Sequence, residues 1–109
     1  MAVTKDFLEY VLDKLSGWGN VYTHKMFGGA ALYQEGLAFG MVADDTVYLK
    51  VDDTNKDKYI KAGSLPLMPF KSHATVLSFY NIPSDIFEDT DNFKKWAKES
   101  YEIQYKRSL

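Results

Sequence analysis

Apolar residues at helical spacing predict an amphipathic helix near each end of the chain. Between positions 4 and 16, five apolar residues recur at intervals of three and four, with charged residues between them. Thr4 has the side chain of an N-cap, and Gly17 and Gly19 stop the pattern. A second stripe, in a helix from about Thr90, consists of Phe93, Trp96, Ala97 and Tyr101. We expect this second stripe to dock on a sheet.

The stretch between these helices becomes strand-like from Val21. Apolar and aromatic residues dominate positions 29–34 and 37–43, and Gln34-Glu35-Gly36 between them is typical of a hairpin turn. A second turn at Asp44-Asp45 leads into residues 46–51. There apolar residues alternate with Tyr48 and Lys50, as in a strand with two different faces. The pattern predicts an antiparallel meander of three strands.

A short polar helix and two further strands complete the predicted fold. Residues 52–55 supply helix-capping side chains, and the helix they start ends near Ala62, before Gly63. Residues 76–80 have a strand pattern and are predicted to pair with residues near 67–71. The predicted order is α-β-β-β-α-β-β-α, in which consecutive strands favour an α+β fold with an antiparallel sheet.

Length and composition indicate a single domain in a reducing compartment. The chain has 109 residues, 46% of them hydrophobic, which is enough for one core over residues 1–109. It contains no cysteine, whereas small secreted domains often depend on disulfides. No signal-peptide pattern precedes the first helix, and the longest apolar stretches are too short to span a bilayer. We therefore expect a cytoplasmic protein without a membrane partner.

The charge pattern argues against direct binding of nucleic acid. The net charge is −2, and Arg107 is the single arginine among thirteen basic residues. Lysines and one arginine lie among the aromatics of the last helix, an arrangement that can bind single strands. Glu99 and Glu102 dilute that charge, so we favour a solvated helix face there.

Few residues suggest catalysis or metal binding. The two histidines, His24 and His73, lie far apart and in no ligand motif, so we expect structural or surface roles. Residues 53–57 begin like a calcium loop, but its required glycine and glutamate positions hold Lys58 and Ser64. Gly28-Gly29 is interpreted as a tight backbone turn rather than as a phosphate cradle. We predict no enzyme activity and no cofactor.

Several segments together resemble the amino-terminal domain of the TfoX (Sxy) family. They are Lys25-Met26-Phe27-Gly28-Gly29, Leu32-Tyr33 and Val47-Tyr48-Leu49-Lys50-Val51-Asp52. The likeness extends from about residue 5 to residue 101. Lys25 stands where the family usually has arginine, and Ala31 where glycine is common.

The resemblance implies a fold and a regulatory context. It implies a two-layer, secretion-chaperone-like α+β domain with a five-stranded antiparallel sheet. Full-length family members activate natural-competence genes together with the cAMP receptor protein, and they carry a second, carboxy-terminal domain. The chain is therefore expected to be a stand-alone first domain. The family supplies no catalytic residues.

A regulatory protein-interaction module is the leading functional hypothesis, with the transcription machinery or a regulator as partner. Tyrosine is abundant in the chain and typical of interfaces. The residues predicted to form the interaction surface are Lys25, Phe27, Tyr33, Tyr48 and Lys50. The alternatives are a self-associating module that forms a homodimer and a small-ligand-binding module.

Overall fold

The computed structural model describes residues 3–26, 29–67 and 76–109. Its elements, in chain order, are α1 (Lys5–Lys14), β1 (Tyr22–Met26), β2 (Gly29–Gln34), β3 (Leu37–Ala43), β4 (Thr46–Lys50), α2 (Lys56–Lys61), β5 (Pro66–Leu67), β6 (Val76–Asn81), α3 (Ser84–Glu88) and α4 (Thr90–Arg107). The predicted α+β class with an antiparallel sheet is confirmed, as are the two long amphipathic helices.

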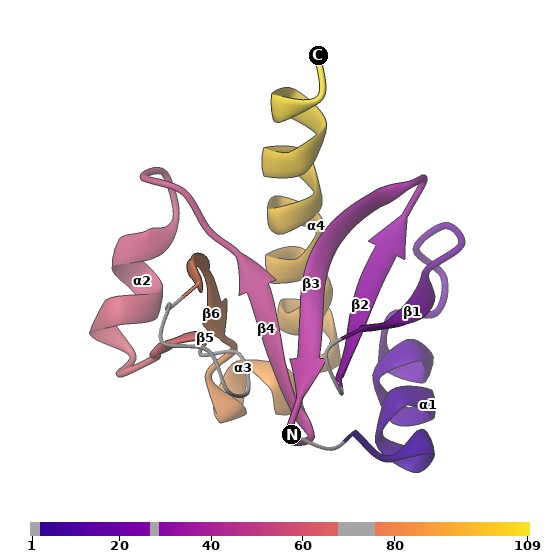
Figure 1. Ribbon diagram of the computed structural model, residues 1–109. Helices are drawn as coiled ribbons and strands as arrows, with labels where there is room; N and C mark the ends of the chain where they lie inside the picture. The colour runs from indigo at the N-terminus through magenta and orange to yellow at the C-terminus, as the bar shows by residue number, and fades with distance from the viewer. Residues whose placement is uncertain (1–2, 27–28, 68–75) are drawn as a thin grey trace.

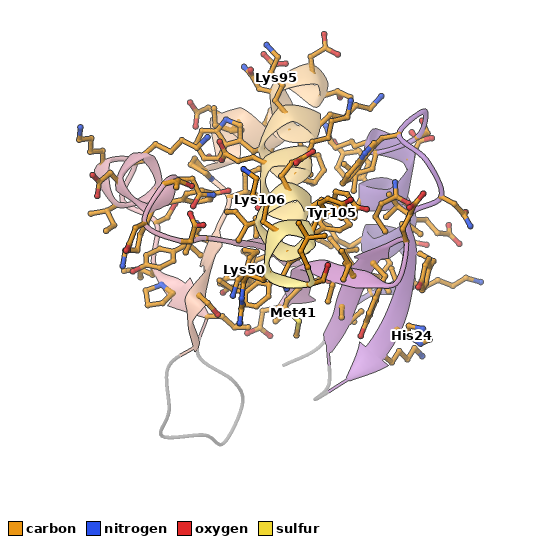
Figure 2. The ribbon with its side chains drawn as sticks, turned by 90° about the horizontal axis from the view of Figure 1, so that it is seen from above. His24, Met41, Lys50, Lys95, Tyr105 and Lys106 are labelled. Atoms are coloured by element: carbon orange, nitrogen blue, oxygen red, sulfur yellow. The ribbon has the colours of Figure 1, made fainter. Side chains whose placement is uncertain are left out.

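The strands form one antiparallel sheet, and the helices lie on one side of it. The strand order is β1-β2-β3-β4-β6-β5, with every neighbouring pair antiparallel. In Figure 1 the long helix α4 runs behind β3 and β4, and α1 lies behind the β1 end of the sheet. The view from above in Figure 2 places the helices together on one side. The result is a two-layer domain.

The described sheet has six strands, so the expected number of five is wrong. The additional strand is β1, which pairs with β2 from Tyr22↔Tyr33 to Met26↔Gly29. Its sequence, Tyr-Thr-His-Lys-Met, lacks the apolar alternation of a half-buried strand. As the edge strand of the described sheet, β1 tolerates polar residues on both faces, so the strand-like pattern from Val21 did not mark it as a strand of its own.

The short helix α3 is a second element that the pattern did not predict. It follows Pro83, whose carbonyl oxygen accepts a hydrogen bond from the Phe87 amide at 3.0 Å. A helix of five residues is too short to show an apolar period. The strand predicted near residues 67–71 is β5 as far as Leu67, and residues 68–71 lie outside the described ranges.

Both predicted hairpin turns are present, and each has two residues in the left-handed region. Glu35 and Gly36 have φ of 49° and 79°, and Asp44 and Asp45 both have φ of 51°. Two-residue loops of this kind match the twist of the paired strands. The Asp45 carboxylate also accepts a hydrogen bond from the Thr4 amide at 2.9 Å, which ties the start of α1 to the β3–β4 turn. Thr4 caps α1, as predicted, by accepting from the Phe7 amide.

The core lies between the sheet and the helices. Fully buried side chains come from α1, the central strands and α4, and include Val11, Leu15, Leu32, Val42, Leu49, Phe93 and Ala97. A shift of register beside Leu32 and Tyr33 interrupts the β2–β3 ladder. Such a bulge changes the direction of the side chains beside it. On β3, opposite the bulge, Phe39 packs on Trp18 with ring centroids 5.1 Å apart. Trp18 in turn contacts Tyr101 of α4, so the predicted stripe docks on the sheet through this cluster as well.

Candidate functional site: the open face of the sheet

The side of the sheet away from the helices carries a continuous row of large side chains. Directly paired residues of an antiparallel sheet share a face. One face can therefore be followed across five strands through the directly paired residues. These pairs are Tyr22↔Tyr33, His24↔Ala31, Ala31↔Met41, Met41↔Tyr48, Tyr48↔Asn81 and Lys50↔Phe79. We call Tyr22, His24, Tyr33, Met41, Tyr48, Lys50, Phe79 and Asn81 the open face. In Figure 2, His24 and Met41 project from the sheet on the side opposite α4.

Most side chains of the open face are half-buried rather than buried. None of the described helices covers them, and their shelter comes largely from neighbours on the sheet itself. This applies to Tyr22, Tyr33, Met41, Tyr48 and Phe79. Large apolar side chains in such a position present a surface that a partner could cover.

Three rings cluster at the β1 end of the open face. Tyr22 and Tyr33 stack with centroids 5.5 Å apart and an interplanar angle of 12°. His24 packs edge-on against both, at 5.6 Å from Tyr22 and 5.1 Å from Tyr33. Cross-strand ring contacts of this kind stabilise the pairing of an edge strand. The histidine therefore has a packing role, and its exposed ring remains accessible from solvent.

Tyr48 occupies the middle of the open face. It lies on β4 between Met41 of β3 and Asn81 of β6. Partial burial raises the pKa of the Tyr48 phenol, and the negative charge of Asp44 raises it further. Tyr48 is therefore a neutral phenol at physiological pH, which combines an apolar ring with one hydroxyl group.

Lys50 ends the row and is the most buried cation of this face. The residue as a whole is 5% exposed, and the ammonium nitrogen lies 5.4 Å from the centre of the Phe79 ring. Burial lowers the pKa of Lys50, and the positive charge of Arg107 adds to that effect, while Asp52 opposes it. The backbone of Lys50 is held by α4, because its carbonyl oxygen accepts from the Ser100 hydroxyl at 2.8 Å.

The structure brings together three of the five residues predicted for an interaction surface. Tyr33, Tyr48 and Lys50 share the open face. Lys25 is exposed on β1 but pairs with Ala30, which places it on the opposite face, and Phe27 lies outside the described residues. Sequence reasoning missed the neighbours on the other strands, namely Tyr22, Met41 and Phe79. These residues belong to the open face because of the register between neighbouring strands, and the hydrophobic pattern of one strand does not contain that register.

The other residues considered for phosphate or metal binding have structural roles where they lie within the described ranges. Gly29 opens β2 so close to β3 that an added Cβ would lie 2.3 Å from the Val42 carbonyl oxygen. The acidic stretch before α2 forms a turn in which the Asp52 carboxylate accepts from the Thr54 amide at 2.8 Å. Within residues 3–26, 29–67 and 76–109, no three His, Cys, Asp or Glu side chains gather as metal ligands. His73 lies outside these ranges.

The fold and the open face define a small two-layer α+β domain with helices on one side of its sheet and an aromatic surface on the other. The family model of the TfoX N-terminal domain matches residues 13–103. The chain therefore belongs to the TfoX N-terminal domain family. Comparison with curated proteins gives no match. Among the described helices, none is long and apolar enough to cross a membrane.

Proposed function

We propose that this domain is a non-enzymatic regulatory module that binds a protein of the transcription apparatus through the open face of its sheet. The observation that carries the proposal is the row of half-buried aromatic and apolar side chains on the side without helices. The face of the sheet that the helices cover already supplies the hydrophobic core. The apolar side chains of the open face are therefore not needed to hold the helices on the sheet.

The composition of the open face suits protein recognition. Tyrosine and methionine are enriched at interfaces, and tyrosine combines a large apolar ring with a hydrogen-bonding hydroxyl. Tyr33 and Tyr48 provide two such anchors, and Met41 between their strands provides an adaptable apolar surface. A sheet whose strands are already held by backbone hydrogen bonds loses little conformational entropy when it binds.

The expected partner is a regulator of competence genes. The domain belongs to the TfoX N-terminal domain family, whose full-length members are expected to act with the cAMP receptor protein. We infer that the partner is that receptor protein or the RNA polymerase bound with it. Contact through another protein, rather than through DNA, agrees with a net charge of −2.

The direct test measures binding of the purified partners to this protein. Purified cAMP receptor protein and RNA polymerase, separately and together on promoter DNA, are titrated with the wild type and with Tyr48→Ala. We expect the substitution to weaken binding at least tenfold, because a central aromatic anchor is lost. The matched control is Tyr105→Ala, which removes a tyrosine that is 47% exposed on α4. No binding by the wild type, or equal binding by Tyr48→Ala, would contradict the proposal.

Self-association is a second candidate, favoured by the free edge of β1. In the described sheet β1 has a neighbour on one side only, so its second edge can pair with the same strand of another copy. Sedimentation at several protein concentrations would then show a dimer. A monomer up to high micromolar concentration would exclude this candidate and leave the protein-partner proposal untouched.

A further inference from the structure

Three aromatic rings from α1 and α3 pack together at the surface of the helical layer. The centre of the Phe87 ring lies 5.9 Å from that of Phe7 and 5.8 Å from that of Tyr10. Phe87 also packs on the fully buried Phe93, at 4.9 Å, so the group continues the core outward. Tyr10 is 48% exposed, and Phe7 and Phe87 are half-buried. We call Phe7, Tyr10 and Phe87 the helix-layer cluster.

An ammonium group of the chain already contacts the helix-layer cluster. The Lys14 nitrogen lies 4.9 Å from the centre of the Tyr10 ring and 5.1 Å from that of the Phe87 ring. Both distances are within the range of cation–π contacts. Tyr10 keeps its exposure with Lys14 in place, so a group from outside can still contact it. The cluster therefore combines an apolar surface with rings that accept a cation.

Acidic residues lie beside the helix-layer cluster. Asp6 and Asp13 come four positions before and three positions after Tyr10, which makes them its neighbours on the surface of α1. Glu88 follows Phe87 directly on α3. All three acids are exposed, and none of them forms an ion pair with a residue of the described ranges. Their charges are therefore available to a partner.

The negative charge is concentrated in this region. Residues 5–14 and 84–91 together hold seven acidic residues and two lysines, whereas the whole chain has a net charge of only −2. In Figure 1 the two helices concerned, α1 and α3, both lie at the lower end of the domain. Negative charge around an apolar centre favours a positively charged partner, because complementary potentials steer the encounter and exclude partners of like charge.

We propose that the helix-layer cluster and its neighbouring acids form a docking surface for a basic, amphipathic segment of a protein partner. Apolar side chains of that segment cover the three rings, and its lysine or arginine side chains pair with the acids or lie on the exposed Tyr10 ring. Because the cluster is already packed on the core, little ordering is needed when the segment binds. The surface belongs to the helical layer, so it does not depend on binding through the open face.

The test titrates the full chain with a synthetic amphipathic peptide of leucine and lysine, about 18 residues long so that it can form a helix. A peptide with glutamate in place of lysine is the comparison, and backbone NMR signals report the binding. We expect saturable shifts centred on α1 and α3 with the lysine peptide alone. Raising the NaCl concentration from about 20 mM to about 200 mM should weaken binding severalfold, because salt screens exposed charges. No saturation at the lower salt concentration, or equal binding of both peptides, would contradict the docking surface.

Two tyrosine variants test the contact with the rings. Tyr10→Ala should weaken binding of the lysine peptide at least fivefold, because the most exposed ring of the cluster is lost. The control Tyr105→Ala removes a tyrosine of similar exposure, 47%, from the carboxy-terminal part of α4 and should leave binding unchanged. Circular dichroism checks that both variants are folded. Equal binding by folded Tyr10→Ala and the wild type would overturn the site.

Two double variants test the acids without removing a ring. Asp6→Asn with Asp13→Asn should weaken peptide binding at least threefold. Asp53→Asn with Asp57→Asn removes the same charge from exposed positions before and within α2, and should weaken binding less. Equal weakening by the two pairs would indicate only a general attraction between opposite charges and would overturn the site. A wild-type dimer that the first pair converts to a monomer in sedimentation would identify a second copy as the occupant, which also contradicts the proposal.

Discussion

The two faces of the sheet use the same strands for different purposes. On β4, Val47 and Leu49 point to the helices and are at most 2% exposed, whereas Tyr48 between them belongs to the half-buried open face. The covered face is aliphatic along this strand, and the open face is aromatic with a cation at its end. Aliphatic side chains interlock in a dry core, whereas tyrosine tolerates both water and a partner.

This difference separates stability from recognition along a single strand. Side chains of the covered face contact α1 and α4, so their loss leaves a cavity between two layers. Side chains of the open face contact mainly their neighbours on the sheet, so their loss leaves no enclosed space. Substitutions on the two faces should therefore differ in size and in the property that they change.

The largest expected effect comes from Leu49→Ala. Leu49 is fully buried, and its truncation should lower the free energy of unfolding by about 2–5 kcal/mol. Tyr48→Ala, one residue away on the other face, should cost about 1 kcal/mol, since β-strand substitutions at open positions span roughly that range. Urea unfolding of both variants measures the contrast. Equal losses would show that the open face is part of the core.

Gly29→Ala should be costly although it changes only one methyl group. An added Cβ would meet the Val42 carbonyl oxygen of the neighbouring strand at 2.3 Å, so the backbone must shift. We expect a loss of about 1–3 kcal/mol, the usual range for overpacking. Gly36→Ala is an informative companion, because no atom lies within 4 Å of its added Cβ and its φ of 79° alone opposes the change. A neutral Gly29→Ala would contradict the close approach of β2 and β3.

Lys50→Met should stabilise the free protein at neutral pH. Burial lowers the pKa of Lys50, so just below the ordinary lysine pKa the unfolded chain binds more protons than the folded one. The wild type therefore gains stability as the pH rises through that window, and the full cost of charging Lys50 is present below it. Removing the charge should therefore raise the free energy of unfolding at pH 7. That gain should shrink as the pH approaches the ordinary lysine pKa.

Unfolding experiments across this pH range check the Lys50 prediction. Lys95→Met is the control, because Lys95 is exposed and its loss should change stability little at any pH. A destabilised Lys50→Met at neutral pH would mean that the ammonium group makes a stronger contact than the one with Phe79.

The smallest effect concerns the stacked rings at the β1 end. A double-mutant cycle with Tyr22→Ala and Tyr33→Ala should give a coupling energy of about 0.5–1 kcal/mol, the usual size for an aromatic pair. Chemical denaturation of the four proteins measures it. A coupling near zero would indicate that β1 is held by its backbone pairing with β2 alone.

The sequence by itself determined the local elements with strong periods or turn chemistry. The stripe of Phe93 and Ala97 predicted α4, and the Asp44-Asp45 pair predicted a turn. These features depend on residues a few positions apart, so they are visible in one chain. For the same reason β1 and α3 were missed, because an edge strand and a single helical turn carry no apolar period.

Only the tertiary structure decided which face is covered and which residues meet on the open one. Alternation on β4 divides Leu49 from Tyr48, but it does not say which of them faces α4. The register of β1 with β2 brings Tyr22 to Tyr33, and α4 brings the Ser100 hydroxyl to the Lys50 carbonyl oxygen, although 50 positions separate that last pair. Contacts between distant segments follow from the packing of whole elements, and neither local propensity nor composition specifies that packing.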